Sequence, residues 1–191
     1  MSQYPPEDSL DQGLDRALVE ARRGEEQGVV TLFRAFQPGL VGYLRHRVPG
    51  MEEDLASEAW AGAAGLLPRF EGDARGFRAL LFTLARRRTV DHYRKSGRAP
   101  SVVELTEADE PADGIDLETA VISDLSAQDA IDALVKGLPT AQAEVVLLRV
   151  VGDLSVEEVA DILGRTPGSV RVIQHRALQR LAKKFKKVVT R

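Results

Sequence analysis

Hydrophobic residues recur at three- and four-residue steps through most of the chain, a spacing typical of amphipathic helices. The run from residue 52 to 67 places four small or aliphatic side chains along one face: Leu55, Ala59, Ala63 and Leu66. Pro68 ends this run, and a helical pattern resumes near Phe77. No stretch shows the strict apolar–polar alternation of a half-buried strand. The pattern therefore predicts an all-α chain.

An earlier helical pattern runs from about residue 29 to 48 and contains Pro38. A proline inside a helix removes a backbone hydrogen bond, whereas the first turn of a helix tolerates it. Pro38 therefore either kinks one helix or lies in the first turn of a new one.

A second helical segment is expected from about Ala127, interrupted at residues 138–140. Thr140 is the predicted N-cap of a helix over residues 141–151, because a threonine hydroxyl can accept a hydrogen bond from the free amides of the first turn. Gly152 is expected to end this helix.

Residues 155–184 carry the most specific local pattern. Ser155 and Glu158 have the S-x-x-E spacing of a capping box at the start of a short apolar helix. Gly164 suits the left-handed conformation of a tight turn, Thr166 suits an N-cap, and Pro167 suits a first helical position. Two short helical patterns joined by such a turn predict a helix-turn-helix.

The second helix of this motif divides into two faces at about 100° per residue. Five residues are expected to face inward: Val170, Ile173, Ala177, Leu178 and Leu181. The candidate contacts to the major groove of DNA lie at the helix start and on the other face: Thr166, Ser169, Arg171, Val172, His175, Arg176 and Gln179. Arg171 and Arg176 suit guanine edges or phosphates, whereas Gln179 suits a phosphate. Val172 either contacts a thymine methyl group or is a tolerated exposed valine.

Charge is segregated along the chain, although the net charge is only −3 and the pI about 5.7. Residues 86–98 contain six basic residues and one acid, residues 99–133 contain ten acids and no base, and residues 165–191 contain nine bases and no acid. The basic blocks favour contact with phosphates, which outweighs the mildly acidic balance. The acidic block, with Pro100 and Pro111, is expected to be a flexible linker. The predicted organisation is therefore a helical domain over 10–98, an acidic linker over 99–126 and a helix-turn-helix domain over 127–187.

Several function classes are disfavoured. The chain has no cysteine and only three histidines, which lie far apart, so no metal site and no cofactor is expected. No nucleotide-binding loop or nucleophile motif is present, so an enzyme is not expected. No apolar run reaches the roughly 18 residues that span a membrane, and residues 1–6 lack the pattern of a signal peptide. We expect no membrane insertion and a cytoplasmic protein.

Two further stretches carry a family resemblance. EDLASEAW at residues 53–60 and FRALLFTLARRRTVDHYRK at residues 77–95 resemble the first domain of bacterial sigma factors of the extracytoplasmic-function (ECF) type. Residues 138–181 resemble the reader of the promoter −35 element in the same family. Ser57, Leu80 and Arg87 stand where the family usually has glutamine, tryptophan and asparagine. The resemblance implies an alternative sigma factor that directs RNA polymerase to promoters.

Residue roles follow from this resemblance. It implies that core RNA polymerase binds at Asp54, Ser57 and Glu58. It implies contact with the melted −10 element at a pocket loop and a basic helix: Phe70, Gly72, Arg75, Arg86, Arg87, Tyr93, Arg94 and Lys95. Trp60 either assists polymerase docking or packs locally, and the linker either threads through polymerase or is an inert tether. The implied partners are core RNA polymerase, promoter DNA and an anti-sigma factor. The alternative is a stand-alone helix-turn-helix transcriptional regulator.

Overall fold

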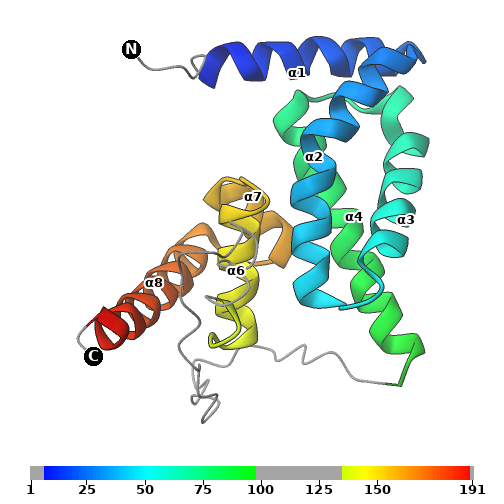
Figure 1. Ribbon diagram of the computed structural model, residues 1–191. Coiled ribbons are helices and arrows are strands. Elements are labelled where there is room, and N and C mark those ends of the chain that lie inside the picture. The colour runs from blue at the N-terminus through cyan, green and yellow to red at the C-terminus, as the bar shows by residue number, and fades with distance from the viewer. Residues whose placement is uncertain (1–6, 98–134, 190–191) are drawn as a thin grey trace. The chain divides into compact units, whose positions relative to one another are not determined.

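The computed structural model describes residues 7–97 and 135–189. Within these ranges every regular element is a helix, as the hydrophobic spacing predicts (Figure 1). The elements are α1 (Glu7–Arg22), α2 (Glu26–Arg47), α3 (Glu52–Leu66), the short 3₁₀ helix η1 (Leu67–Arg69), α4 (Ala74–Lys95), α6 (Thr140–Val150), α7 (Val156–Leu163) and α8 (Pro167–Val189). They form two compact units that divide between His92 and Tyr93. The predicted linker over 99–126 and the helix start near Ala127 lie outside the described residues.

In the first unit α1 and α3 pack against α2, and aromatic side chains of α4 pack on those of α2 in the same core. The largest buried side chains in this core are Leu18, Leu32, Leu40, Tyr43, Leu44, Phe77, Leu81 and Phe82. Tyr43 of α2 and Phe82 of α4 meet edge to face, with ring centroids 5.6 Å apart. Figure 1 shows α1 lying across the end of this unit at which the α3–α4 connection also lies. This arrangement places α1 beside the predicted pocket loop.

Gly28 sets how closely α1 approaches α2. A Cβ atom at this buried position would lie 2.4 Å from the Ala17 carbonyl oxygen and 2.7 Å from the Glu20 Cβ, closer than real contacts allow. The two backbones therefore touch directly at this point, and only glycine fits.

Pro38 lies inside α2, which continues as one helix over 22 residues. The first of the two alternatives for Pro38, a proline within one helix, is therefore the correct one. Side chains of α2 are buried on both sides of Pro38, and their burial stabilises the helix by more than the lost backbone hydrogen bond costs.

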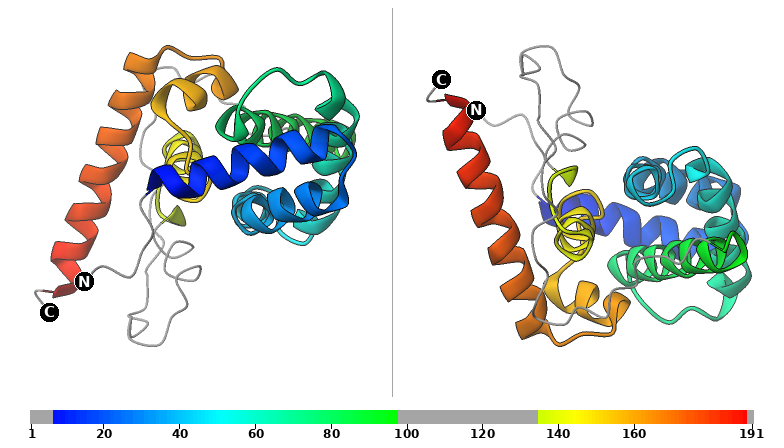
Figure 2. Two further views of the ribbon diagram at one scale, coloured as in Figure 1. Left: turned by 90° about the horizontal axis from the view of Figure 1, so that it is seen from above. Right: turned by 90° about the horizontal axis from the view of Figure 1, so that it is seen from below.

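The second unit consists of α6, α7 and α8, and α8 packs against both shorter helices. Its most deeply buried side chains are Val145, Leu147, Leu148, Leu154, Val159, Ala160, Val170 and Ala177. In both views of Figure 2, α8 is a long helix that extends well past α7. The Arg149 guanidinium donates a hydrogen bond to the Leu154 carbonyl and so connects the end of α6 to the residue just before the α7 cap.

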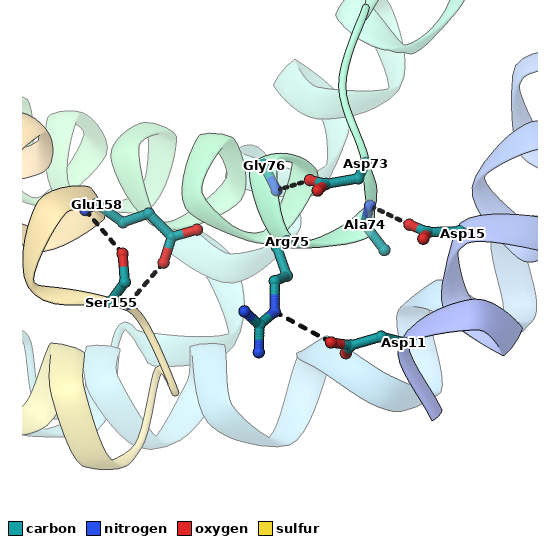
Figure 3. Close-up of polar contacts among 8 residues, drawn as sticks. All are labelled: Asp11, Asp15, Asp73, Ala74, Arg75, Gly76, Ser155 and Glu158. Atoms are coloured by element: carbon teal, nitrogen blue, oxygen red, sulfur yellow. Dashed lines mark hydrogen bonds and ion pairs between the residues drawn. The ribbon is translucent and has the colours of Figure 1, made fainter. Parts of the chain in front are cut away.

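The turn chemistry predicted for this unit is confirmed. The Ser155 hydroxyl accepts a hydrogen bond from the Glu158 amide at 3.1 Å, and the Glu158 carboxylate accepts one from the Ser155 amide at 2.6 Å (Figure 3). Gly164 ends α7 with a φ of +64°, in the left-handed region. The Thr166 hydroxyl caps α8 by accepting a hydrogen bond from the Ser169 amide at 3.2 Å. These contacts fix the angle at which α8 leaves α7.

Three sequence predictions are wrong in detail. Thr140 is the first residue of α6 rather than its cap, and Pro139 precedes it without a side-chain hydrogen bond to the helix. Leu178 was expected inside, but it is 51% exposed. It lies about 80° around α8 from Val170, at the edge of the stripe whose centre is Ala177. Leu66 is likewise exposed, and the neighbouring Leu67 is buried in its place.

Candidate nucleic-acid interface

The helix α8 presents a polar face opposite its buried stripe. Val170 and Ala177 are fully buried, whereas the predicted DNA contacts are exposed except for the half-buried Ser169. A capped helix with one side held in the core and the other in solvent can enter a major groove. The described geometry is therefore compatible with every predicted −35 contact: Thr166, Ser169, Arg171, Val172, His175, Arg176 and Gln179.

Arg171 is engaged by an acid on the neighbouring helix. Its Nη2 atom lies 2.7 Å from Glu157 Oε1 of α7, and both side chains are about 60% exposed to solvent. An exposed ion pair of this kind contributes only about 0.2–1 kcal/mol. A phosphate or a guanine edge can therefore displace Glu157 from the guanidinium.

His175 and Gln179 are also paired, through Nε2 atoms 2.9 Å apart on adjacent turns of α8. This contact orients two polar side chains toward the same solvent face that carries Arg176. Val172 stands on this face with 49% of its surface exposed, so the choice between a thymine contact and a tolerated valine stays open.

The predicted pocket loop, residues 70–76, is closed around the Phe70 ring. This ring packs edge to face against Phe77 of α4, with centroids 5.6 Å apart. A Cβ atom at Gly72 would lie 2.6 Å from the Phe70 ring, so the ring requires glycine at this position. The Asp73 carboxylate caps the start of α4 by accepting a hydrogen bond from the Gly76 amide at 2.7 Å (Figure 3).

Three residues of α1 contact this loop, and none of them is among the site residues predicted from the sequence. Asp15 accepts a hydrogen bond from the Ala74 amide at 2.8 Å, and Asp11 lies 3.1 Å from the Nε atom of Arg75 (Figure 3). Arg22 donates a hydrogen bond to the Gly72 carbonyl. These partners are 50 or more residues apart in sequence, so no local pattern points to them.

The basic residues of the predicted −10 surface lie on α4. Arg87, Arg94 and Lys95 are exposed, whereas Arg86 and Tyr93 are half-buried. At about 100° per residue, Arg87 and Arg94 lie only about 20° apart around the helix axis, and Lys95 lies about 100° further round than Arg94. The helix therefore presents Arg87 and Arg94 on one side, with Lys95 displaced from them.

The predicted polymerase contacts occupy the solvent face of α3. Asp54, Ser57 and Glu58 are all exposed, on the side opposite the buried Ala59 and Ala63. Glu58 is engaged by Arg88 of α4 at 3.5 Å. Any other cation that approaches Glu58 therefore has to compete with Arg88.

Trp60 packs within the first unit. Its indole Nε1 donates a hydrogen bond to Gln37 Oε1 at 2.8 Å, and its ring lies 5.2 Å from Phe33 and 6.2 Å from Phe77. The local-packing alternative accounts for these contacts. Phe33 is 43% exposed, so this aromatic pair extends to the surface.

Among residues 7–97 and 135–189, no helix is both long enough and apolar enough to cross a membrane. In the same described part of the chain, no group of three or more His, Cys, Asp or Glu side chains is arranged to hold a metal ion.

Comparison with known families assigns both units. The Sigma-70 region 2 family matches residues 32–99, and the Sigma-70 region 4 family matches residues 128–181. These two regions define the class, a protein of the sigma-70 kind.

Two similar relatives identify the group within this class. The chain is 34% identical to the ECF RNA polymerase sigma factor SigD of Mycobacterium tuberculosis over 88% of this chain and 82% of SigD. It is 35% identical to the ECF RNA polymerase sigma factor ShbA of Streptomyces griseus over 86% of this chain and 92% of ShbA. The chain belongs to the ECF RNA polymerase sigma factors and is an alternative sigma factor.

Two solved structures share the fold. The structure of CnrH in complex with the cytosolic domain of CnrY matches with a TM-score of 0.60 at 20% identity, covering 91% of this chain and 98% of CnrH. The sigma factor RpoE of Bartonella quintana, in complex with the anti-sigma factor NepR, matches with a TM-score of 0.58 at 24% identity, covering 81% of this chain and 94% of RpoE. These likenesses support the all-helical fold predicted from the sequence.

Proposed function

We propose that this sigma factor divides promoter recognition between its two units. The polar face of α8 reads the −35 duplex, and the loop over residues 70–76 with the basic part of α4 holds the melted −10 strand. Core polymerase docks on Asp54, Ser57 and Glu58 of α3. The observation that carries the −35 assignment is the capped α8, which buries Val170 and Ala177 and leaves Arg171 and Arg176 exposed.

The −10 assignment is supported by the loop and by the charge of α4. A base that leaves the stack costs a few kcal/mol, and capture on an aromatic ring offsets part of that cost. Phe70 supplies such a ring, and Arg75 supplies a charge for a phosphate at the same loop. The arginines of α4 extend this surface along the strand.

The corresponding domain bounds are 10–98 for the polymerase and −10 domain, 99–126 for the linker and 127–187 for the −35 domain. The proposal assigns no catalytic step to the chain and places its action in the cytoplasm, where core polymerase works. It includes an anti-sigma partner, as the sigma factor RpoE of Bartonella quintana binds the anti-sigma factor NepR in its solved structure.

The division of roles is tested with two variants in reconstituted holoenzyme. Arg176→Ala is expected to reduce transcription from promoters that carry a −35 element, while binding to core polymerase stays unchanged. Asp54→Ala is expected to weaken core binding in a pull-down, because it removes an exposed acid from the α3 docking face. If both variants lose the same function to the same extent, the division of roles is wrong.

A stand-alone regulator is the remaining alternative for the mode of action, and the free protein tests it. A gel shift without polymerase is expected to show weak promoter binding. Tight, sequence-specific binding by the free protein would favour the regulator.

A further inference from the structure

The helix α1 holds the loop over residues 70–76 at several points, although the matched Sigma-70 region 2 segment begins only at residue 32. Asp11, Asp15 and Arg22 lie along one face of α1 at spacings of four and seven residues, so they face the loop together. Figure 3 shows Asp15 directed at the Ala74 amide and Asp11 directed at Arg75, where α4 begins. One helix thus reaches both the backbone and a side chain of the loop.

Asp15 completes the capping of α4 from a distant part of the chain. The first amides of a helix have no partner within that helix, and they attract negative charge. Asp73 accepts from the Gly76 amide at 2.7 Å, and Asp15 accepts from the Ala74 amide at 2.8 Å. The first turn of α4 is therefore fixed both from within the loop and from α1.

Arg22 holds the other end of the loop. Its guanidinium donates to the Gly72 carbonyl and lies 5.6 Å from the centroid of the Phe70 ring, on which it makes a cation–π contact. The same ring packs on Phe77 at 5.6 Å. Arg22 therefore fixes both the backbone of Gly72 and the orientation of Phe70.

We propose that Asp15 and Arg22 are positioning residues that set the base selectivity of the loop at the −10 element. This inference rests on the proposed −10 function of the loop. A loop that is ordered before it meets DNA loses less conformational entropy on capture, and a fixed ring discriminates between bases more sharply than a mobile one. Asp15 and Arg22 supply that order from α1 without touching DNA themselves.

The experiment compares two templates in transcription by reconstituted holoenzyme: a promoter recovered from a genomic library, and the same promoter with the captured −10 base replaced. The measured quantity is the ratio of transcript from the two templates. A single mismatched position costs about tenfold in a typical specific complex, so the unaltered protein is expected to show a ratio of about ten. Arg22→Met and Asp15→Ala are expected to lower this ratio to about three or less, because the unpaired loop accepts either base.

Matched variants separate positioning from a loss of folding. Arg16→Met removes the same charge from an exposed position of α1, and it is expected to keep the ratio. Asp15→Asn keeps an oxygen acceptor for the Ala74 amide, and it is expected to restore most of the ratio. Hydrogen exchange of the Ala74 amide is expected to accelerate about tenfold in Asp15→Ala, while core amides of α2 stay protected.

A loop variant distinguishes failure of this inference from failure of the proposed function. If Phe70→Ala lowers the ratio while Arg22→Met and Asp15→Ala retain it, the positioning role is overturned and the −10 role of the loop stands. If Phe70→Ala also retains the ratio, the positioning role of Asp15 and Arg22 and the −10 role of the loop are both overturned. Equal losses in Arg16→Met and Arg22→Met would likewise overturn the positioning role.

Discussion

The ion pair between Glu157 and Arg171 predicts that an acid on α7 restrains −35 binding. Arg171 Nη2 lies 2.7 Å from Glu157 Oε1, so this carboxylate competes with DNA for the guanidinium. Glu157→Gln removes the charge but keeps the size of the side chain. The free guanidinium is then expected to bind phosphate or guanine more tightly.

The magnitude follows from the exposure of the pair. Both side chains are about 60% exposed, and exposed pairs contribute about 0.2–1 kcal/mol. Releasing Arg171 therefore raises the affinity for DNA by about 1.4- to 5-fold. The gain is expected to shrink at high salt, because salt already screens an exposed pair.

The assay is fluorescence anisotropy of holoenzyme with a duplex oligonucleotide that contains the −35 element. Asp161→Asn is the matched control, because it removes an equal charge one turn further along α7, at another exposed position. Arg171→Ala combined with Glu157→Gln completes a double-mutant cycle, in which the gain is expected to disappear. Equal gains in Glu157→Gln and Asp161→Asn would refute the reasoning, because the effect would then be general repulsion of DNA. A loss of affinity in Glu157→Gln would refute it as well.

Three further predictions concern stability. Gly28→Ala is expected to destabilise the protein by about 1–3 kcal/mol in urea unfolding, because the added Cβ meets the Ala17 carbonyl; an unchanged midpoint would contradict the close approach of α1 and α2. Ser155→Ala is expected to cost about 1 kcal/mol through loss of the α7 cap, whereas Ser155→Asp is expected to restore most of it. The pKa of Glu52 lies below its usual value of 4.5, chiefly because its own backbone amide and that of Gly50 donate to the carboxylate, with Arg45 adding to the effect. The ionised Glu52 carboxylate therefore stabilises the fold above pH 4.5, and this stabilisation is lost as the pH falls through the folded-state pKa. Glu52→Gln is expected to lower the melting temperature at pH 7 and to have little effect on it near pH 3. An equal change in melting temperature at the two pH values would contradict this cause.

The second unit could be predicted from the sequence nearly residue by residue, because its turns are specified locally. Ser155, Gly164 and Thr166 each act within three residues of their partners, and all three have the predicted roles. The two errors have local causes. Pro139 takes the N-cap position with a non-helical ψ of 144°, so Thr140 is already the first helical residue. Leu178 lies at the edge of an apolar stripe, where periodicity alone does not decide burial.

The site in the first unit could be predicted only in part. Glycines and an aromatic residue mark the loop over residues 70–76, and basic residues mark α4. The contacts of Asp15 and Arg22 with that loop span 59 and 50 residues, so they depend on how α1 packs against the unit. Hydrophobic periodicity indicates that α1 packs, but not which polar residues of α1 meet which backbone atoms.

Transcription by purified core polymerase tests the central claim most directly. The template is a library of genomic fragments, with and without this chain. Promoter-specific transcripts are expected only when the chain is present, and they are expected to share a −35 and a −10 element at a constant spacing. No transcripts above those of core polymerase alone would contradict the account.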